Sequence, residues 1–148
     1  MREHGIFIGG ARQAGSGTIT VRSPYDGAEV AHVGRAGAAD LGTALAAAVA
    51  AREAMAALAP HRRAAILDAA SAEVARRRDE LAAVIVAEAG KPITLAGLEA
   101  ERCAETLADA ARVARTPHGE LLDLGGFPSG EKRLGLLRRV PIGVVAGI

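Results

Sequence analysis

Cys103 is the only cysteine in the chain, which makes it the first residue to test for chemistry. A lone thiol in an intracellular enzyme can serve as a nucleophile. Its position favours packing instead, because Leu98, Cys103 and Leu107 share an apolar stripe on the helix predicted over residues 93–114. Apolar surroundings suppress the thiolate form of cysteine. The sequence therefore predicts a buried, structural Cys103, and as a lone cysteine it cannot form an internal disulfide.

Histidine and carboxylate groups form no metal-binding or acid–base pattern. The histidines are scattered, without the spacing of a metal-binding pair, and we expect surface or capping roles for them: His4, His32, His61 and His118. Glu99, Glu101 and Glu105 crowd one predicted helix, but the last two share a face with Arg102 in a pattern typical of solvated charges. From these groups we predict no catalytic residue and no metal ligand.

The glycine-rich segments lack the pattern of a phosphate-binding loop. Gly9-Gly10 and Gly15-Ser16-Gly17 do not have the spacing of a dinucleotide-binding turn. Gly90-Lys91 is followed by Pro92, where a nucleotide triphosphate loop requires Ser or Thr. These glycines are therefore expected to form turns or helix ends.

Charge and composition argue against several classes of partner. The formal net charge is +1 with both signs interspersed, and the chain holds two Phe, one Tyr and no Trp. It therefore has neither the basic field nor the aromatic side chains that favour nucleic-acid binding. Arg76-Arg77-Arg78 is followed by Asp79 and Glu80. We interpret this cluster as one helix end meeting the next helix start, with phosphate binding as the alternative. No apolar run reaches the roughly 20 residues of a membrane span, and we expect a cytoplasmic protein without a membrane partner.

The elements that must position these residues are strands followed by helices. Through about Gly34, short apolar–polar alternations between turn residues predict antiparallel strands. From about Ala38 the hydrophobic period becomes helical. A second helix is predicted to begin at Pro60, a third to end at Gly90, and a fourth to span residues 93–114. The stripe expected to pack the first helix comprises Leu41, Leu45, Val49 and Met55. A loop at residues 125–130 then precedes a strand near residues 132–139.

Residues 140–148 form a near-continuous apolar run with glycines, typical of a strand covered on both faces in a parallel sheet. Such a strand normally leads into a crossover helix, and an unpaired one would present an apolar edge to other chains. We therefore expect these 148 residues to be the front portion of a larger enzyme. The alternative is a terminal strand docked on the protein's own sheet.

In chain order, several segments resemble the N-terminal part of the aldehyde dehydrogenase superfamily. They are Phe7-Ile8-Gly9-Gly10, Ser23-Pro24-Tyr25-Asp26-Gly27 with Glu29-Val30, Arg63 and Leu67, Glu88-Ala89-Gly90-Lys91-Pro92, Glu99 and Arg102, and Arg138-Arg139-Val140-Pro141-Ile142-Gly143-Val144-Val145. The fourth segment resembles the family's Glu-x-Gly-Lys-Pro. The region from Leu121 to Gly135 is somewhat similar to the lactaldehyde, phosphonoacetaldehyde and non-phosphorylating glyceraldehyde-phosphate branch.

The resemblance implies an α/β fold with three parts. Short antiparallel strands and an Ala-rich helical bundle, residues 1–115, would form the outer part of a cofactor-binding domain. Residues 116–139 would form a hairpin arm for oligomerisation, and residues 140–148 the first strand of a Rossmann-like sheet.

The reaction that the resemblance implies is oxidation of a small aldehyde to a carboxylic acid with NAD or NADP. It requires a thiolate, an oxyanion donor and a base for water. None of the family's positions for these groups falls within the chain, and Cys103 matches none of them. Only Ile148 is carried over, as a backbone contact of the cofactor.

Two functional hypotheses remain open. The chain is an aldehyde dehydrogenase fragment, inactive and without bound cofactor on its own, or a shortened, non-catalytic relative that keeps the arm and pairs with a full-length partner. Either way we expect a homo-oligomer or self-association.

Overall fold

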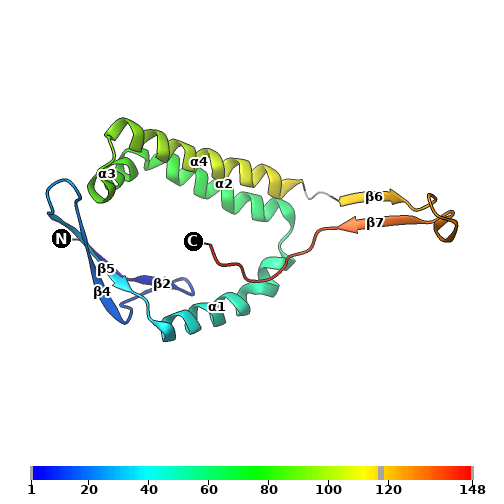
Figure 1. The fold of residues 1–148 in the computed structure, drawn as a ribbon, viewed down its shortest axis with the longest axis horizontal. Coiled ribbons are helices and arrows are strands. Elements are labelled where there is room, and N and C mark those ends of the chain that lie inside the picture. Colours follow the sequence, from blue (N-terminus) through cyan, green and yellow to red (C-terminus); the bar gives the residue numbers. More distant parts are fainter. Residues whose placement is uncertain (1, 117–118, 148) are drawn as a thin grey trace.

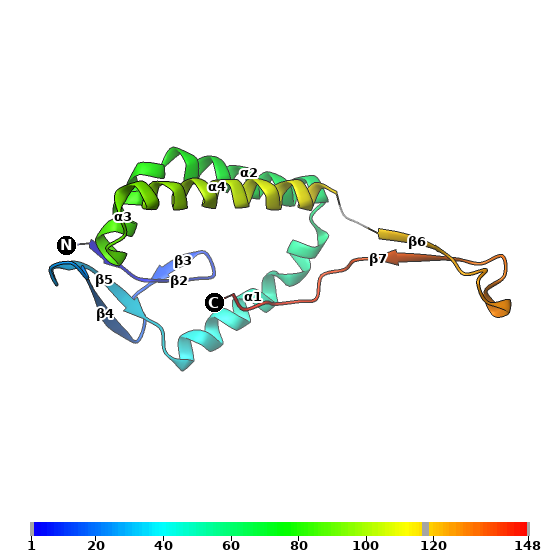
Figure 2. The same cartoon turned by 45° about the horizontal axis from the view of Figure 1, so that its top comes forward.

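The computed structural model describes residues 2–116 and 119–147, and its elements lie along an open frame (Figure 1). Strands gather at one end, helices form the middle, and a two-stranded arm projects from the other end. A second view shows the same arrangement, with the C-terminal residues running back from the arm into the space between the helices (Figure 2). The structure is therefore a mixed α/β arrangement, as the sequence predicts.

The N-terminal strands form a three-stranded sheet and a separate hairpin. They are β1 (Arg2–His4), β2 (Ile6–Ile8), β3 (Ala11–Gln13), β4 (Gly17–Arg22) and β5 (Glu29–Arg35). β4 pairs antiparallel with β5, and β2 pairs antiparallel with β3, as expected. β1 pairs parallel with β5, so the expectation of antiparallel strands was wrong there. The reason is that β2, β3 and β4 intervene between them, and a strand pair without a tight connecting turn is free to be parallel.

The helix boundaries follow the proline and glycine signals of the sequence. The helices are α1 (Ala38–Ala57), α2 (Pro60–Arg76), α3 (Arg78–Ala89) and α4 (Ile93–Arg115). Pro60 occupies the first turn of α2, where its missing N–H costs no hydrogen bond. Gly90 ends α3 in the left-handed region, at φ 65°, and its N–H donates to the Val86 carbonyl. These boundaries confirm the sequence prediction.

α2 and α4 lie side by side and bury small residues against each other (Figure 1). Ala64 of α2 and Ala96, Ala100 and Ala111 of α4 are almost completely buried. The Ser71 hydroxyl donates to the Ala104 carbonyl across the pair at 2.8 Å. Among the described residues no large side chain is fully buried, so this core consists mainly of alanine.

α1 stands apart from the other helices, and its predicted stripe is exposed. Leu41, Leu45, Val49 and Met55 each keep at least half of their surface open, so the expected packing of this stripe was wrong. The periodicity is present, but the described elements near this face leave the stripe largely open. Among the described residues no single helix is long and apolar enough to cross a membrane. α1 and α2 reach that measure only as a pair, and the pair is bent by 119°.

The arm is an antiparallel hairpin of β6 (Gly119–Asp123) and β7 (Leu134–Arg138). Its tip contains a short 3-10 turn, Pro128–Gly130, in the predicted loop. Leu121, Leu134 and Leu136 are 69%, 69% and 80% exposed. The hairpin coincides with the segment expected to form an arm; residues 117 and 118 of that segment lie outside the described residues.

Residues 140–147, called the tail below, are extended but carry no strand ladder. A strand requires a neighbouring backbone, and no described segment pairs with the tail, so the first sheet strand expected over residues 140–148 stays a prediction. Ile142 and Val145 are 91% and 70% exposed. The tail is an apolar segment without a sheet.

Candidate functional site

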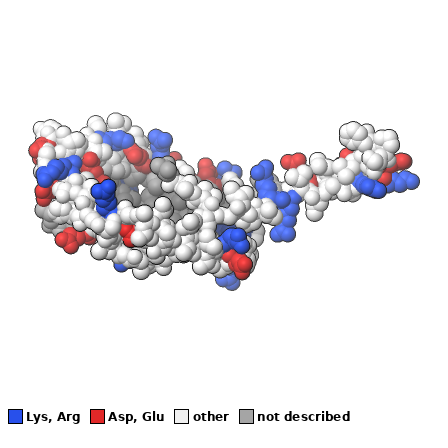
Figure 3. All heavy atoms as spheres, turned by 60° about the horizontal axis from the view of Figure 1, so that its bottom comes forward, with Lys and Arg blue, Asp and Glu red and all other residues white. Residues whose placement is uncertain are grey.

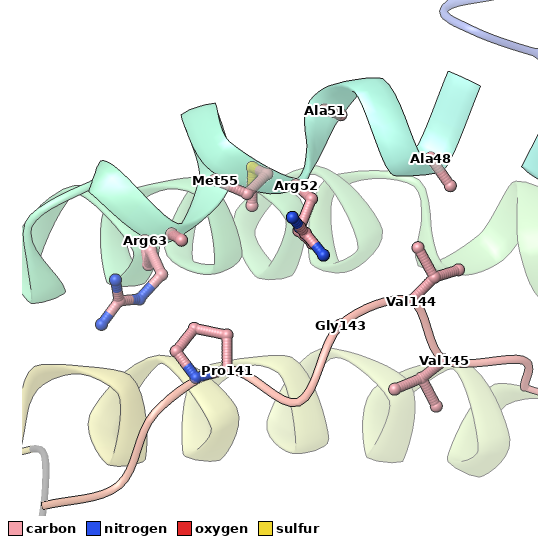
Figure 4. Close-up of a pocket in the computed structure, with 10 residues that line it drawn as sticks. Ala48, Ala51, Arg52, Met55, Arg63, Pro141, Gly143, Val144 and Val145 are labelled. Carbon is pink, nitrogen blue, oxygen red and sulfur yellow. The ribbon is translucent and has the colours of Figure 1, made fainter. Parts of the chain in front are cut away.

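A cavity of about 460 Å³ lies between α1 and the tail. Figure 4 shows Ala48, Ala51, Arg52 and Met55 of α1 along one wall. The opposite wall is formed by the tail residues Pro141, Gly143, Val144 and Val145, and Arg63 of α2 lies at the Pro141 end. The walls are mostly apolar, with two guanidinium groups among them.

Small residues on α1 leave room for the tail. Ala48 and Ala51 recur at helical spacing on the wall, so no long side chain fills the space. Val144 points toward Ala48, and Val145 points to the other side, as alternate residues of an extended chain do (Figure 4). Gly143 has φ 115°, a conformation that other residues rarely adopt, so the bend of the tail depends on glycine there.

A second cavity of about 520 Å³ lies where the arm, the tail and the helices meet. Its walls include Pro60 and Arg63 at the start of α2, Leu137 of the arm, and Val140 and Pro141 of the tail. Basic side chains gather where the arm joins the body, whereas on the rest of this face both signs are mixed (Figure 3). The junction is therefore the most cationic part of the visible face.

Ile148, the one position expected to contact a cofactor, lies outside the described residues. Of the residues just before it, Gly147 has no heavy atom within 4 Å of the place where a Cβ would stand. Gly34 and Gly37 flank the turn from β5 to α1, but they lack the G-x-G-x-x-G spacing with which a strand-to-helix turn binds a dinucleotide.

Cys103 is exposed, which overturns the expectation of a buried thiol. The same error placed Leu98 in the core, and Leu98 is 53% exposed. α4 instead turns Ala96, Ala100 and Ala111 toward its neighbours. Close helix packing selects the alanines of α4, and the stripe of larger residues is not its packed face.

The arginine cluster lies at the junction of two helices, as interpreted from the sequence, because α2 ends at Arg76 and α3 begins at Arg78. Arg76 pairs with Glu73, and Arg77 pairs with Glu80, each at 2.6 Å. The hydrogen bond from Arg76 lowers the pKa of Glu73. Ion pairs thus occupy this cluster, which weakens the alternative of phosphate binding.

The carboxylates considered for acid–base chemistry also take part in ion pairs. Glu101 accepts a hydrogen bond from Arg78 at 2.7 Å, which joins α3 to α4, and Glu99 pairs with Lys91. Glu105 is exposed. Among the described residues, no group of three or more His, Cys, Asp or Glu could hold a metal ion.

The histidines are not brought together with one another into a site. His4 and His61 are exposed, and His118 lies outside the described residues. His32 is half-buried, 3.3 Å from the Thr20 hydroxyl and 3.8 Å from Glu29. Gly9 and Gly10, with φ 60° and 86°, form the tight turn between β2 and β3 and not a phosphate loop.

Sequence reasoning missed the two cavities around Arg63. The available signal was the pair Ala59-Pro60, which breaks the helix and brings the end of α1 next to the start of α2. Nothing local indicated that residues 140–141 return to this corner from eighty positions later.

Comparison with known proteins identifies the family to which this fold belongs. Residues 11–148 match the aldehyde dehydrogenase family. The chain belongs to the aldehyde dehydrogenase family. It is 35% identical over 130 residues to aspartate-semialdehyde dehydrogenase 1 of Pseudomonas canavaninivorans, covering 88% of this chain and 28% of that protein. It is 29% identical over 148 residues to 3-sulfolactaldehyde dehydrogenase of Priestia aryabhattai, covering 100% of this chain and 31% of that protein.

Solved aldehyde dehydrogenases superpose on the same frame. Aldehyde dehydrogenase 21 from Physcomitrella patens, in complex with the reaction product succinate, matches with a TM-score of 0.87 at 30% identity, over 93% of this chain and 29% of that one. Lactaldehyde dehydrogenase from Escherichia coli matches with a TM-score of 0.75 at 31% identity, over 81% and 26%. The chain thus spans about a quarter to a third of the length of these relatives, and it corresponds to their N-terminal portion.

Proposed function

We propose that these residues act as the N-terminal portion of an NAD- or NADP-dependent aldehyde dehydrogenase that oxidises a small aldehyde to a carboxylic acid. The observation that supports this most directly is the TM-score of 0.87 with aldehyde dehydrogenase 21 over 93% of the chain. Their part is architectural: the strands and helices surround the tail, from which the nucleotide-binding sheet would start. We place this enzyme in the cytoplasm.

The exposed apolar faces support a role within a larger assembly of secondary structure. The alanine core buries little apolar area, whereas Leu41, Met55, Ile142 and Val145 remain open. Many large apolar side chains left exposed on two neighbouring segments support the proposal that α1 and the tail pack against further protein. A sheet continuing from the tail would cover α1 and the tail together.

No step of the oxidation is assigned to a residue of this chain. The resemblance places the nucleophile, the oxyanion donor and the base outside these 148 residues, and exposed Cys103 on α4 has no neighbouring group that would activate it among the pairs described above. We therefore expect the 148-residue chain to show no aldehyde-dependent reduction of NAD or NADP.

Two measurements test this proposal. A panel of small aldehydes is assayed with the purified chain and each cofactor, and turnover that disappears in Cys103→Ser would contradict it. The coding sequence beyond the Ile148 codon is also translated in all three forward frames. A Pro-aromatic-Asn segment there is expected, because the oxyanion donor of the family lies on it. An unrelated continuation or a stop would count against the proposal.

A second function is favoured by the arm. β6 and β7 project from the body with Leu121, Leu134 and Leu136 exposed, which suits association with another subunit. A non-catalytic protein that pairs with a full-length dehydrogenase would need only this arm. A stop directly after Ile148, together with stable binding to such an enzyme through the arm, would favour this function over the first.

The arm also bears on the choice of aldehyde. Its similarity to the lactaldehyde, phosphonoacetaldehyde and glyceraldehyde-phosphate branch supports a small polar aldehyde as substrate. Lactaldehyde and glyceraldehyde 3-phosphate are therefore the first members of the assay panel for any longer polypeptide that carries this portion.

A further inference from the structure

The corner between α1 and α2 places the Leu58 carbonyl outside the helical hydrogen-bond ladders. α1 ends at Ala57 and α2 begins at Pro60, with the helix axes bent by 119°. Leu58 lies between them with φ −61° and ψ 131°, an extended conformation. Its carbonyl accepts a hydrogen bond from Arg63 Nη1 at 2.5 Å. Arg63 therefore closes the corner, because it supplies the donor that the helices do not.

Arg63 is also shared by the two cavities. Three residues line both of them: Ala56 of α1, Arg63 of α2 and Pro141 of the tail. Figure 4 shows Arg63 and Pro141 at the same end of the cavity. The guanidinium thus lies where the corner, the tail and the base of the arm meet.

The chemistry of the tail suits a donor at this point. The peptide bond before Pro141 has a carbonyl but no N–H, so it can only accept hydrogen bonds. A guanidinium carries five N–H donors in a planar fork, and one bond to Leu58 leaves the others free to act. Among the described residues no strand ladder holds the tail, so a side-chain contact at this point would contribute to fixing its course.

We propose that Arg63 is a positioning residue that binds the Leu58 carbonyl with one nitrogen and holds the tail at Pro141 with the remainder of its guanidinium. The corner, the arm base and the tail then move as one unit. The direction in which the tail leaves the arm is set by Arg63. This proposal does not depend on the dehydrogenase function, because its test uses neither aldehyde nor cofactor.

Trypsin cleavage after Arg139 tests the proposal in the 148-residue chain. While the tail is held against the corner, the peptide bond after Arg139 fits the trypsin active site poorly. The cleavage rate is therefore proportional to the population of molecules whose tail has detached from the corner. We expect Arg63→Met to raise this cleavage rate roughly five- to tenfold, the factor that corresponds to losing one net hydrogen bond. Cleavage after Arg133, in the arm, serves as the internal reference and should not change.

Arg62→Met is the matched control, because Arg62 is the neighbouring residue, is exposed and lines neither cavity. It should leave both rates unchanged. Arg63→Lys separates the two contacts: one ammonium can satisfy Leu58 but lacks the fork, so thermal stability should stay near that of the parent while cleavage after Arg139 is fast.

Three results would overturn the proposal. Cleavage after Arg139 that is unchanged in Arg63→Met would show that Arg63 does not hold the tail. Equal acceleration at Arg133 and Arg139 would show that the residue contributes only general stability. Full protection of the tail in Arg63→Lys would show that the bidentate bridge is not required.

Discussion

At the scale of single residues, Cys103 shows how the helix face decides reactivity. Because its side chain is exposed on α4, a thiol reagent should reach it in the folded chain. We expect native labelling within about threefold of a free model thiol, and little acceleration in denaturant. Labelling followed by mass spectrometry measures both rates. A native rate a hundredfold slower would mean that the thiol is covered, for instance by self-association.

Asp26 is expected to make one turn sensitive to acid. Its carboxylate accepts a hydrogen bond from the Ala28 N–H at 3.1 Å, and the hydrogen bonds from Ala28 and from Ser23 lower its pKa below the usual 3.8. A carboxyl whose pKa is lower in the folded state stabilises the fold above pH 3.8, and the contribution is lost as pH falls through the folded value.

The measurement is a carboxyl titration by NMR, with the Ala28 amide shift as a second probe of the turn. Asp26→Asn is the control, because the amide oxygen still accepts from Ala28 but does not titrate. The Ala28 amide should move with pH in the parent and stay constant in the variant. A folded pKa at or above 3.8 would contradict the assigned hydrogen bonds.

At the scale of elements, the α2–α4 pair depends on side-chain size. Ala111 is fully buried and its neighbour Ala110 is exposed. A longer side chain at Ala111 would have to separate the helices, and we expect Ala111→Leu to lower the free energy of unfolding by about 1–3 kcal/mol. Ala110→Leu should change it by less than about 0.5 kcal/mol.

Urea denaturation of the two variants and the parent checks this prediction. The substitutions are chemically identical and one position apart, so differences in helix propensity cancel. If both variants lose the same free energy of unfolding, α4 does not pack on α2 through the face that contains Ala111.

The helices show what the sequence could and could not predict. Pro60 and Gly90 mark boundaries through backbone geometry, which acts locally, and the structure confirms both. The buried face of α4 cannot be predicted in the same way, because alanines occur on several sides of the helix and do not single out one face. Close approach of two helices selects small side chains, a choice that depends on the partner helix and not on α4 alone.

Contacts between distant segments of the chain could not be predicted from local sequence patterns. The parallel contact of β1 with β5 and the return of the tail to the α1–α2 corner join parts of the chain that no local pattern relates. The tail has the composition of a central strand, yet composition cannot supply the neighbouring strands. The strand expected over residues 140–148 therefore stays a prediction, because the neighbouring strands that it needs are not among the described residues.

At the scale of the whole molecule, the open tail should drive association. Ile142 and Val145 are 91% and 70% exposed on an extended segment with free backbone groups, which favours pairing between copies. We expect oligomers that grow with concentration, and a shift toward monomer when both residues are replaced by lysine or when the chain ends at Arg139.

Light scattering over a concentration series measures the association. Gln13→Lys combined with Ser129→Lys is the control, because it adds the same charge at exposed positions away from the tail. Only the tail variant should dissociate. Equal dissociation in the control would attribute the effect to net charge, and a parent that is monomeric at high concentration would mean that the tail does not pair.

The alanine core has a consequence for the order of events during synthesis. In a longer polypeptide of this family, these residues leave the ribosome before the segments that follow them, and chains grow at roughly 5–20 residues per second. α2 and α4 can pack together as soon as both have emerged, since the residues buried on them are small and their contact needs no later segment. α1 and the tail cannot bury their larger side chains until later segments of the polypeptide emerge. Their apolar surface stays exposed during that time. Such a waiting period of several seconds is the window in which a molecular chaperone would be of most use to this protein.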